Sequence, residues 1–277
     1  MRSSLLYFSF FLFVFSGCSH LVPTYNKRVA TLEHLISAKG LKKEIVLTRY
    51  FNLFSVHIDL LKCKDSTANV YIEGDGLSWI TSHIPSNNPT PIDPIALKLA
   101  LKDKNPCTIY IARPCQYTNS NSCKTDVWTN KRFSIEVIKS YNEALDKIKK
   151  RYKISSYKLF GYSGGGAVAT ILAAKRSDIS YLITICGNLD TAYWTKLHHI
   201  SPLKGSLNPA DFSKELTKIK QLHLIGKKDK IVPFAVFKSY LDKFNNRKNI
   251  EYKLFNEFNH HCCWVEDWTK ILKMIKR

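Results

Sequence analysis

Residues 159–169 read LFGYSGGGAVA and place one serine, Ser163, among four glycines. The apolar residues at the start of this stretch predict a strand, and the small residues at its end predict a helix. Gly161, Ser163 and Gly165 fit the pattern G-x-S-x-G, in which a serine nucleophile occupies a sharp turn between a strand and a helix. An ordinary glycine–serine loop is the alternative, and the strand–turn–helix context favours the nucleophile.

The glycines have a physical role in such a turn. The nucleophile takes a strained backbone conformation there, and side chains two positions before and after it would collide with neighbouring elements. The helix that follows directs its first amides toward the reacting atoms, so the N–H of Gly164 is a candidate donor to an oxyanion.

A serine hydroxyl also needs a base within hydrogen-bond reach, and the base needs a carboxylate that orients it. Both follow the serine along this chain. Asp229 comes just after the strand-like run 221–225, and His260 follows the strand-like run 250–255. Ser163, Asp229 and His260 are therefore the predicted catalytic residues.

Other residues could fill the same roles. His261 could replace His260, and Asp190 or Asp211 could replace Asp229, because the KKDK run around Asp229 is also typical of a solvated surface turn. The adjacent pairs in the run HHCC lack the C-x-x-C or H-x-x-x-H spacing of metal sites, so no metal is predicted. Its two cysteines, Cys262 and Cys263, are expected to bridge elsewhere.

Strand and helix patterns alternate through the second half of the chain. Such alternation predicts an α/β fold with a mostly parallel sheet and helices on both faces, and a hairpin near the start could add an antiparallel edge. The expected strands are 44–51, 53–60, 69–72, 107–112, 157–160, 181–186, 221–225 and 250–255. The expected helices are 29–36, 94–101, 133–152, 167–174, 234–244 and 264–275.

With these motifs in order, the sequence from about Val46 to the C-terminus resembles an α/β-hydrolase. The pieces that carry the resemblance are GYSGG at 161–165, GKKDKIVP at 226–233 and FNHHCCW at 258–264. The resemblance implies Ser163 as nucleophile, His260 as general base and Asp229 as its orienting acid. It also implies that the N–H of Asp75 or Gly76, in the run NVYIEGDG, is the second oxyanion donor. Glu73 stands there in place of the histidine that is more usual in the family.

The N-terminus is typical of export. A short basic start is followed by an apolar run from Leu5 to Phe15, which is too short for a permanent membrane span and fits a signal peptide. The run ends at FSGCS, which resembles a bacterial lipobox and implies lipidation of Cys18; a plain signal peptide is the alternative. We therefore expect a signal peptide over 1–17, a lipidated tether with a short helix over 18–44, and a hydrolase domain over 45–277. Ser19 favours the outer membrane of the cell envelope.

Cysteine usage is consistent with an oxidising compartment. Beside Cys18 there are seven cysteines, so at least one has no partner within the chain. Cys115 and Cys123 lie in a polar, loop-like segment and are expected to form a disulfide. The set EGDG, RPCQY, GYSGG and HCCW also resembles exported bacterial lipoprotein hydrolases.

The net charge of +20 comes from 42 Lys and Arg against 22 Asp and Glu. The lysines are spread along the chain and no nucleic-acid-binding signature is present, so no nucleic-acid partner is predicted. We expect a monomeric serine hydrolase that cleaves small-molecule or lipid esters, needs no cofactor and reaches the membrane through its anchor. Thioesters and amides remain open as substrates. A non-catalytic binding lipoprotein and a serine peptidase of the same fold are the alternatives.

Overall fold

The computed structural model describes residues 22–37, 40–58, 60–118 and 120–275. Cys18 and the expected signal peptide lie outside these residues. The strands are β1 (Lys42–Val46), β2 (Leu53–His57), β3 (Thr67–Ile72), β4 (Thr108–Ile111), β5 (Ser156–Tyr162), β6 (Ile179–Ile185), β7 (Gln221–Gly226) and β8 (Ile250–Phe255). The helices are α1 (Tyr25–Ser37), α2 (Ile95–Ala100), α3 (Ile135–Tyr152), α4 (Gly164–Lys175), α5 (Thr191–Leu197), α6 (Ser213–Leu216), α7 (Phe234–Leu241) and α8 (Trp264–Ile275).

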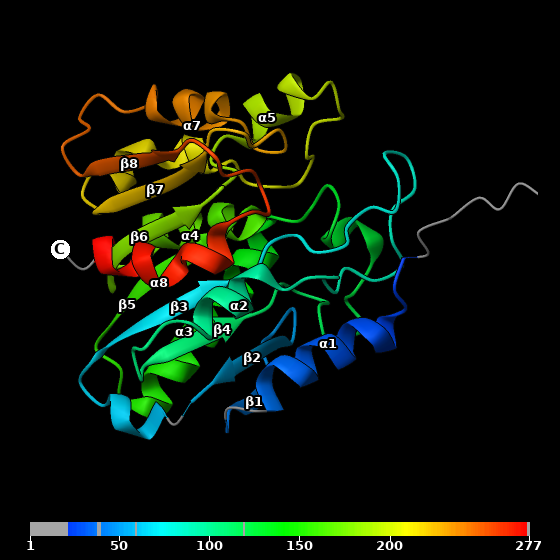
Figure 1. The fold of residues 1–277 in the computed structure, drawn as a ribbon, viewed down its shortest axis with the longest axis vertical. Helices are drawn as coiled ribbons and strands as arrows, with labels where there is room; N and C mark the ends of the chain where they lie inside the picture. The colour runs from blue at the N-terminus through cyan, green and yellow to red at the C-terminus, as the bar shows by residue number, and fades with distance from the viewer. Residues whose placement is uncertain (1–21, 38–39, 59, 119, 276–277) are drawn as a thin grey trace, which may run out of the picture.

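The strands form one eight-stranded sheet in the order β1-β2-β4-β3-β5-β6-β7-β8 (Figure 1). Strands β3 to β8 are parallel to one another, and β1 and β2 are antiparallel additions at one edge. The predicted α/β class, with its mostly parallel sheet and antiparallel edge hairpin, is confirmed. Because parallel strands end at the same edge of a sheet, the loops after β3, β5, β7 and β8 meet there.

Helices cover both faces of this sheet. Helices α3, α4 and α7 bury their apolar side chains against one face, where Val137, Ala167 and Phe237 belong to one core cluster. Helices α1, α2 and α8 cover the other face, where Leu97 and Trp268 belong to a second cluster. Figure 1 shows α1, α2 and α8 in front of the sheet and α4 behind it. The central strands are therefore buried on both faces, as their apolar runs predict, whereas the edge strands β1 and β8 are largely exposed.

Some elements differ from their predicted extents. Strand β1 ends at Val46, before the predicted end at residue 51, because the side chain of Thr48 donates to the carbonyl of Phe51 (2.6 Å) and closes the turn into β2. The segment 18–44 contains α1 and the start of β1, and Leu32 and Ile36 of α1 are buried in the core. Within the described part of the chain, no helix has the length and hydropathy required to cross a membrane.

Three disulfides are present among the described cysteines. Cys115 pairs with Cys123, as expected from the sequence, and Cys63 pairs with Cys107 across 44 residues. Cys262 and Cys263 pair with each other, so the expectation of partners elsewhere was wrong: the four cysteines of the other two disulfides are already paired, and Cys186 is buried and unpaired.

Candidate active site

Ser163 lies on the turn between β5 and α4, at φ 53° and ψ −120°. A non-glycine residue rarely adopts this left-handed region, so the turn holds the serine in a strained conformation. Two flanking glycines make the turn possible. A Cβ on Gly161 would lie 2.4 Å from the carbonyl oxygen of Gly165, and a Cβ on Gly165 would lie 2.3 Å from the carbonyl oxygen of Ile72. Only glycine fits at either position.

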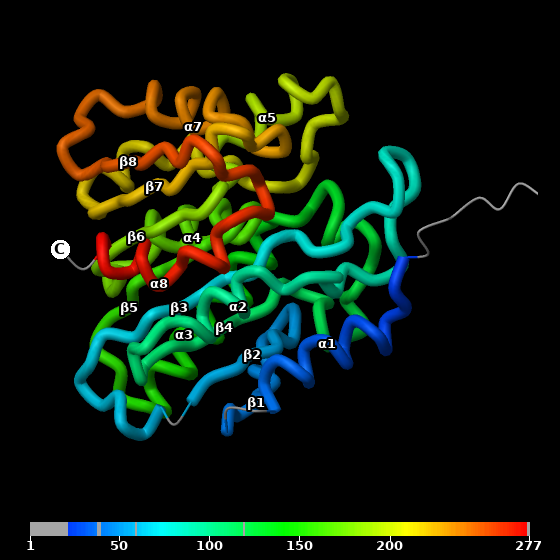
Figure 2. Tube along the Cα trace, viewed as in Figure 1, coloured from blue at the N-terminus to red at the C-terminus, as the bar shows by residue number. Residues whose placement is uncertain are grey.

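The other two predicted residues come to the serine from distant parts of the chain. Nε2 of His260 lies 2.9 Å from Oγ of Ser163, and Nδ1 of His260 lies 2.7 Å from Oδ2 of Asp229. His260 lies on the loop between β8 and α8, and Asp229 follows β7. Figure 2 shows these loops and the loop after β3 leaving the same edge of the sheet. The structure thus joins Ser163, His260 and Asp229 in one line of hydrogen bonds.

The alternatives from the sequence lie elsewhere. The ring of His261 is 3.4 Å from the hydroxyl of Tyr162 and makes no hydrogen bond with Ser163. Asp190 caps α5, where its carboxylate accepts from the amide of Tyr193 and from the hydroxyl of Ser239. Asp211 is exposed and bonds to a nearby asparagine.

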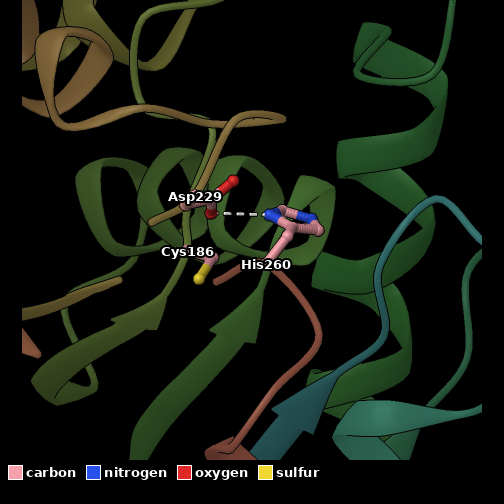
Figure 3. Close-up of side chains that lie close together, drawn as sticks. All are labelled: Cys186, Asp229 and His260. Atoms are coloured by element: carbon pink, nitrogen blue, oxygen red, sulfur yellow. Dashed lines mark hydrogen bonds and ion pairs between the residues drawn. The ribbon is translucent and has the colours of Figure 1, made fainter. Parts of the chain in front are cut away.

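The carboxylate of Asp229 is held in place by its own loop. Oδ1 accepts from the amides of Ile231 and Val232, both at 2.8 Å, which leaves Oδ2 for the histidine (Figure 3). Burial favours the neutral acid, but the hydrogen bond and charge of His260 and the bond from Val232 outweigh it, so the pKa of Asp229 is lowered. The residue therefore stays ionised and can stabilise a histidinium.

Cys186 lies beside Asp229 and was not predicted from the sequence. It follows β6, and its sulfur, a carboxylate oxygen of Asp229 and a ring nitrogen of His260 lie within 4.8 Å of one another (Figure 3). Burial raises the pKa of this thiol well above its usual range, so it stays neutral. It donates to the carbonyl of Asn259 (3.9 Å), and its position beside Asp229 helps to lower the pKa of that carboxyl. Asp229 and His260 already bond each other, so the hydrogen-bonding atoms of these two residues are engaged with one another.

The loop after β3 packs directly against the serine turn. A Cβ on Gly74 would lie 3.4 Å from Cβ of Ser163, and a Cβ on Gly164 would lie 2.1 Å from Oδ1 of Asp75. Gly76 has φ +65° and faces the carbonyl oxygen of Pro89, which explains why glycine is needed there. The amides of Asp75, Gly76 and Gly164 form no hydrogen bond with another described residue. These amides are thus free to bind an oxyanion.

Two arginines hold this loop through Asp75. Nη1 of Arg113 lies 2.9 Å from Oδ1 of Asp75, and Nη1 of Arg132 lies 2.6 Å from Oδ2. Burial favours the neutral acid, but the charges of Arg132 and Arg113 outweigh it and lower the pKa of Asp75. The arginines come from segments far apart in the sequence, and no motif around them indicates the contact.

Glu73 takes the place of the family's more usual histidine. Its buried carboxylate accepts from the amides of Gly74 (2.9 Å) and Ala96 (3.3 Å) and from the hydroxyl of Tyr110 (3.2 Å). Burial raises the pKa of Glu73 to about 7, and these bonds offset only part of the effect. Glu73 therefore anchors the loop after β3 to the start of α2.

A cavity of about 440 Å³ opens at Ser163. Its wall is largely apolar and includes the partly exposed side chains of Trp79, Ile92 and Ile231. Arg132 and Asn188 are among the buried polar residues of this wall.

The parallel sheet, the strained serine turn and the serine–histidine–aspartate line together define an α/β-hydrolase. A family model described as "Serine hydrolase (FSH1)" matches residues 96–255, more than half of the chain, and the chain belongs to this family. The matched range includes Ser163 and Asp229 and ends before His260. The chain is thus a serine hydrolase, as the sequence predicted. No curated protein matches the sequence significantly.

Solved structures share the fold. Est1E from Butyrivibrio proteoclasticus superposes with a TM-score of 0.57 at 14% identity, covering 84% of this chain and 97% of its own. The Pyrococcus furiosus esterase PF2001 gives a TM-score of 0.60 at 13% identity, covering 89% of this chain and 92% of its own. A putative dienelactone hydrolase from Klebsiella pneumoniae gives 0.58 at 14% identity, covering 85% and 96%.

Proposed function

We propose that this serine hydrolase cleaves carboxylic esters through an acyl-enzyme on Ser163. The observation that carries the proposal is the line of two hydrogen bonds, 2.9 Å and 2.7 Å, that joins Ser163 to His260 and His260 to Asp229. The distances lie in the range in which a histidine can take the proton of a serine hydroxyl.

The reaction follows from the positions of these groups. Oγ of Ser163 forms a bond to the carbonyl carbon while Nε2 of His260 takes its proton, and Asp229 stabilises the resulting histidinium. The N–H of Gly164, at the start of the 12-residue helix α4, and the N–H of Asp75 or Gly76 bind the oxyanion. His260 then gives its proton to the leaving oxygen as the alcohol departs. Water, activated by the same histidine, releases the acid and restores the serine.

An ester is the proposed bond because an alcohol leaves more readily than an amine. A thioester would react by the same steps. The largely apolar cavity wall suits an acyl or alcohol group with hydrophobic surface. One of the structures that share the fold, Est1E, has been solved with ferulic acid bound, which agrees with a carboxylic acid product.

The test uses the chain from Ser19 onward and its S163A variant. A fluorophosphonate probe should label the wild type and not the variant, and p-nitrophenyl esters should be hydrolysed only by the wild type. The H261Q variant is the matched control, because His261 adjoins the catalytic histidine and has no bond with the serine. A folded wild type that neither reacts with the probe nor releases p-nitrophenol would overturn the proposal.

We further propose that the protein is an exported envelope lipoprotein, a monomer tethered through Cys18 and facing lipid or small-molecule esters. The support is the apolar run and FSGCS motif of the N-terminus, together with three disulfides among the described residues. Expression of the full chain in bacteria with a labelled fatty acid should give a labelled membrane protein. A C18S variant that retains the label would refute lipidation at this cysteine.

A further inference from the structure

We propose that Arg132 and Asn188 form an anion-binding subsite of the catalytic cavity, which takes a carboxylate group of the ester substrate. This inference rests on the proposed esterase function and narrows its substrate class. Both side chains line the cavity that contains Ser163, and both are at least nine-tenths buried. Each has hydrogen-bonding capacity that no described residue uses.

Arg132 is fixed in place but not saturated. Its Nε donates to the carbonyl of Thr129 (2.5 Å), and its Nη1 donates to Asp75 (2.6 Å). Its Nη2 has no hydrogen-bond partner among the described residues. A planar guanidinium held by two of its nitrogens, with the third free in a cavity wall, is prepared to bind a carboxylate without losing side-chain entropy on binding.

Asn188 supplies a second polar group close to the nucleophile. Its backbone amide donates to the carbonyl of Ser163 (3.1 Å), and its side-chain Oδ1 is buried without a partner. A buried polar atom without a partner costs about 1–3 kcal/mol, so the carboxamide of Asn188 is not fully satisfied by the described residues. The NH2 group of the same side chain makes no hydrogen bond with a described residue, so Asn188 can donate to a bound carboxylate.

The charges around the cavity favour an anion at this position. Asp75 carries one negative charge between Arg113 and Arg132, so this cluster keeps a net charge of +1. The other acids of the wall are already occupied: Glu73 accepts from Gly74, Ala96 and Tyr110, and Asp93 pairs with Lys98 (2.5 Å). His261 has a lowered pKa because of burial and the nearby His260, so it adds no positive charge at neutral pH.

The rest of the wall restricts the substrate further. Trp79, Ile92 and Ile231 give an apolar surface beside the polar pair. The matching ligand is an amphiphilic ester with one hydrophobic part and one carboxylate. Such a half-ester or carboxylated aryl ester would satisfy both Arg132 and Asn188 while its hydrophobic part leaves water.

The test compares esters that differ only in charge. One pair places the charge on the acyl side: 4-nitrophenyl hydrogen adipate and its methyl ester. The other places it on the leaving group: 4-acetoxybenzoate and its methyl ester. Since hydrogen bonds to charged groups contribute about 1.5–3 kcal/mol, we expect the wild type to prefer the carboxylate in one pair by roughly tenfold or more in kcat/KM.

Variants then assign the preference to the subsite. N188D keeps the shape of the side chain and adds a negative charge. It should therefore lower the ratio of kcat/KM for the carboxylate ester to kcat/KM for its methyl ester by at least tenfold. R132Q should abolish the preference for the carboxylate ester. The control is K131Q, which removes a neighbouring exposed charge that pairs with Asp126, and it should keep the wild-type ratio. An unchanged ratio in N188D, if the protein is folded, would contradict the subsite.

The outcomes separate this inference from the function on which it rests. Turnover of both members of each pair with no preference for the carboxylate would overturn the subsite and leave the esterase intact. If no ester is turned over, the subsite is tested by binding instead. Calorimetry measures the affinity of the S163A protein for the monoanilide of adipic acid and for the methyl ester of this anilide. Binding no tighter than that of the methyl ester of this anilide would overturn the subsite independently of catalysis.

Discussion

Replacement of Glu73 by glutamine should change how stability depends on pH. The carboxyl group of Glu73 is fully buried, and its pKa rises from the ordinary 4.5 to about 7. Between these two values the unfolded chain has lost the proton and the folded chain keeps it. The folded state is therefore penalised as pH rises through this window, and the penalty is constant above about pH 7.

The size of the effect follows from the same two values. At 1.36 kcal/mol for each pH unit between them, the penalty approaches about 3 kcal/mol, an order-of-magnitude figure. E73Q is neutral at every pH and can keep an acceptor oxygen toward Gly74 and an NH2 group toward Tyr110. Relative to the wild type, E73Q should therefore gain about 2–3 kcal/mol of unfolding free energy between pH 4.5 and pH 8.

Urea unfolding of both proteins at several pH values measures this difference. The comparison is needed because other groups also titrate: burial lowers the pKa of His223 to about 3, which makes the wild type more stable as pH rises toward 6.5. E251Q, at an exposed position of β8, controls for the loss of a surface carboxylate. If the stability difference between E73Q and the wild type is the same at pH 5 and pH 8, the argument from burial is wrong.

Four further predictions concern the site and the scaffold. H260Q should lower kcat by about a thousandfold or more, whereas H261Q should stay within roughly tenfold of the wild type, as measured with p-nitrophenyl butyrate. D229N should lower kcat by about 10⁴ with little change in the fluorescence of the folded protein, because it removes the acceptor that fixes the histidine tautomer; a fall of less than tenfold would refute the role. G161A should cost more than about 2 kcal/mol of stability in urea unfolding, because its Cβ would lie 2.4 Å from a backbone oxygen, and a neutral result would show that the turn can relax. Replacing both Cys63 and Cys107 by serine should cost about 4 kcal/mol, the loop-closure entropy for a sequence separation of 44, and an unchanged thermal midpoint would contradict this.

The sequence was most informative where function depends on local chemistry. The glycines around Ser163 indicate a turn because they allow a backbone path that no other residue fits, and that requirement acts over a few positions only. Buried strands and the amphipathic helix α3 were predictable for the same reason: a repeat of apolar residues encodes the period of the element. Asp229 and His260 could be named because polar residues that follow parallel strands meet at one edge of the sheet.

The predictions failed or stopped where distant segments meet. The packing of α1 on the core depends on which surfaces come within reach after folding. The bond between the adjacent Cys262 and Cys263 is a separate, local failure of the prediction. Nothing near Arg113 or Arg132 in the sequence indicates that both bind Asp75, since they lie 38 and 57 residues from it. Such contacts are selected by geometry over long separations, and residue type alone permits many of them.

The sequence by itself determined the class of fold, the nucleophile and the order of the residues that serve it, because these follow from repeat patterns and turn chemistry within short stretches. The tertiary structure decided which of the two adjacent histidines reaches Ser163, since only Nε2 of His260 lies 2.9 Å from its hydroxyl. It also decided that Cys186 supports Asp229 and that Arg132 and Asn188 share the cavity of the serine. The physical reason is that hydrogen bonds and charge contacts act over a few ångströms, and only the packed sheet brings these loops within that range.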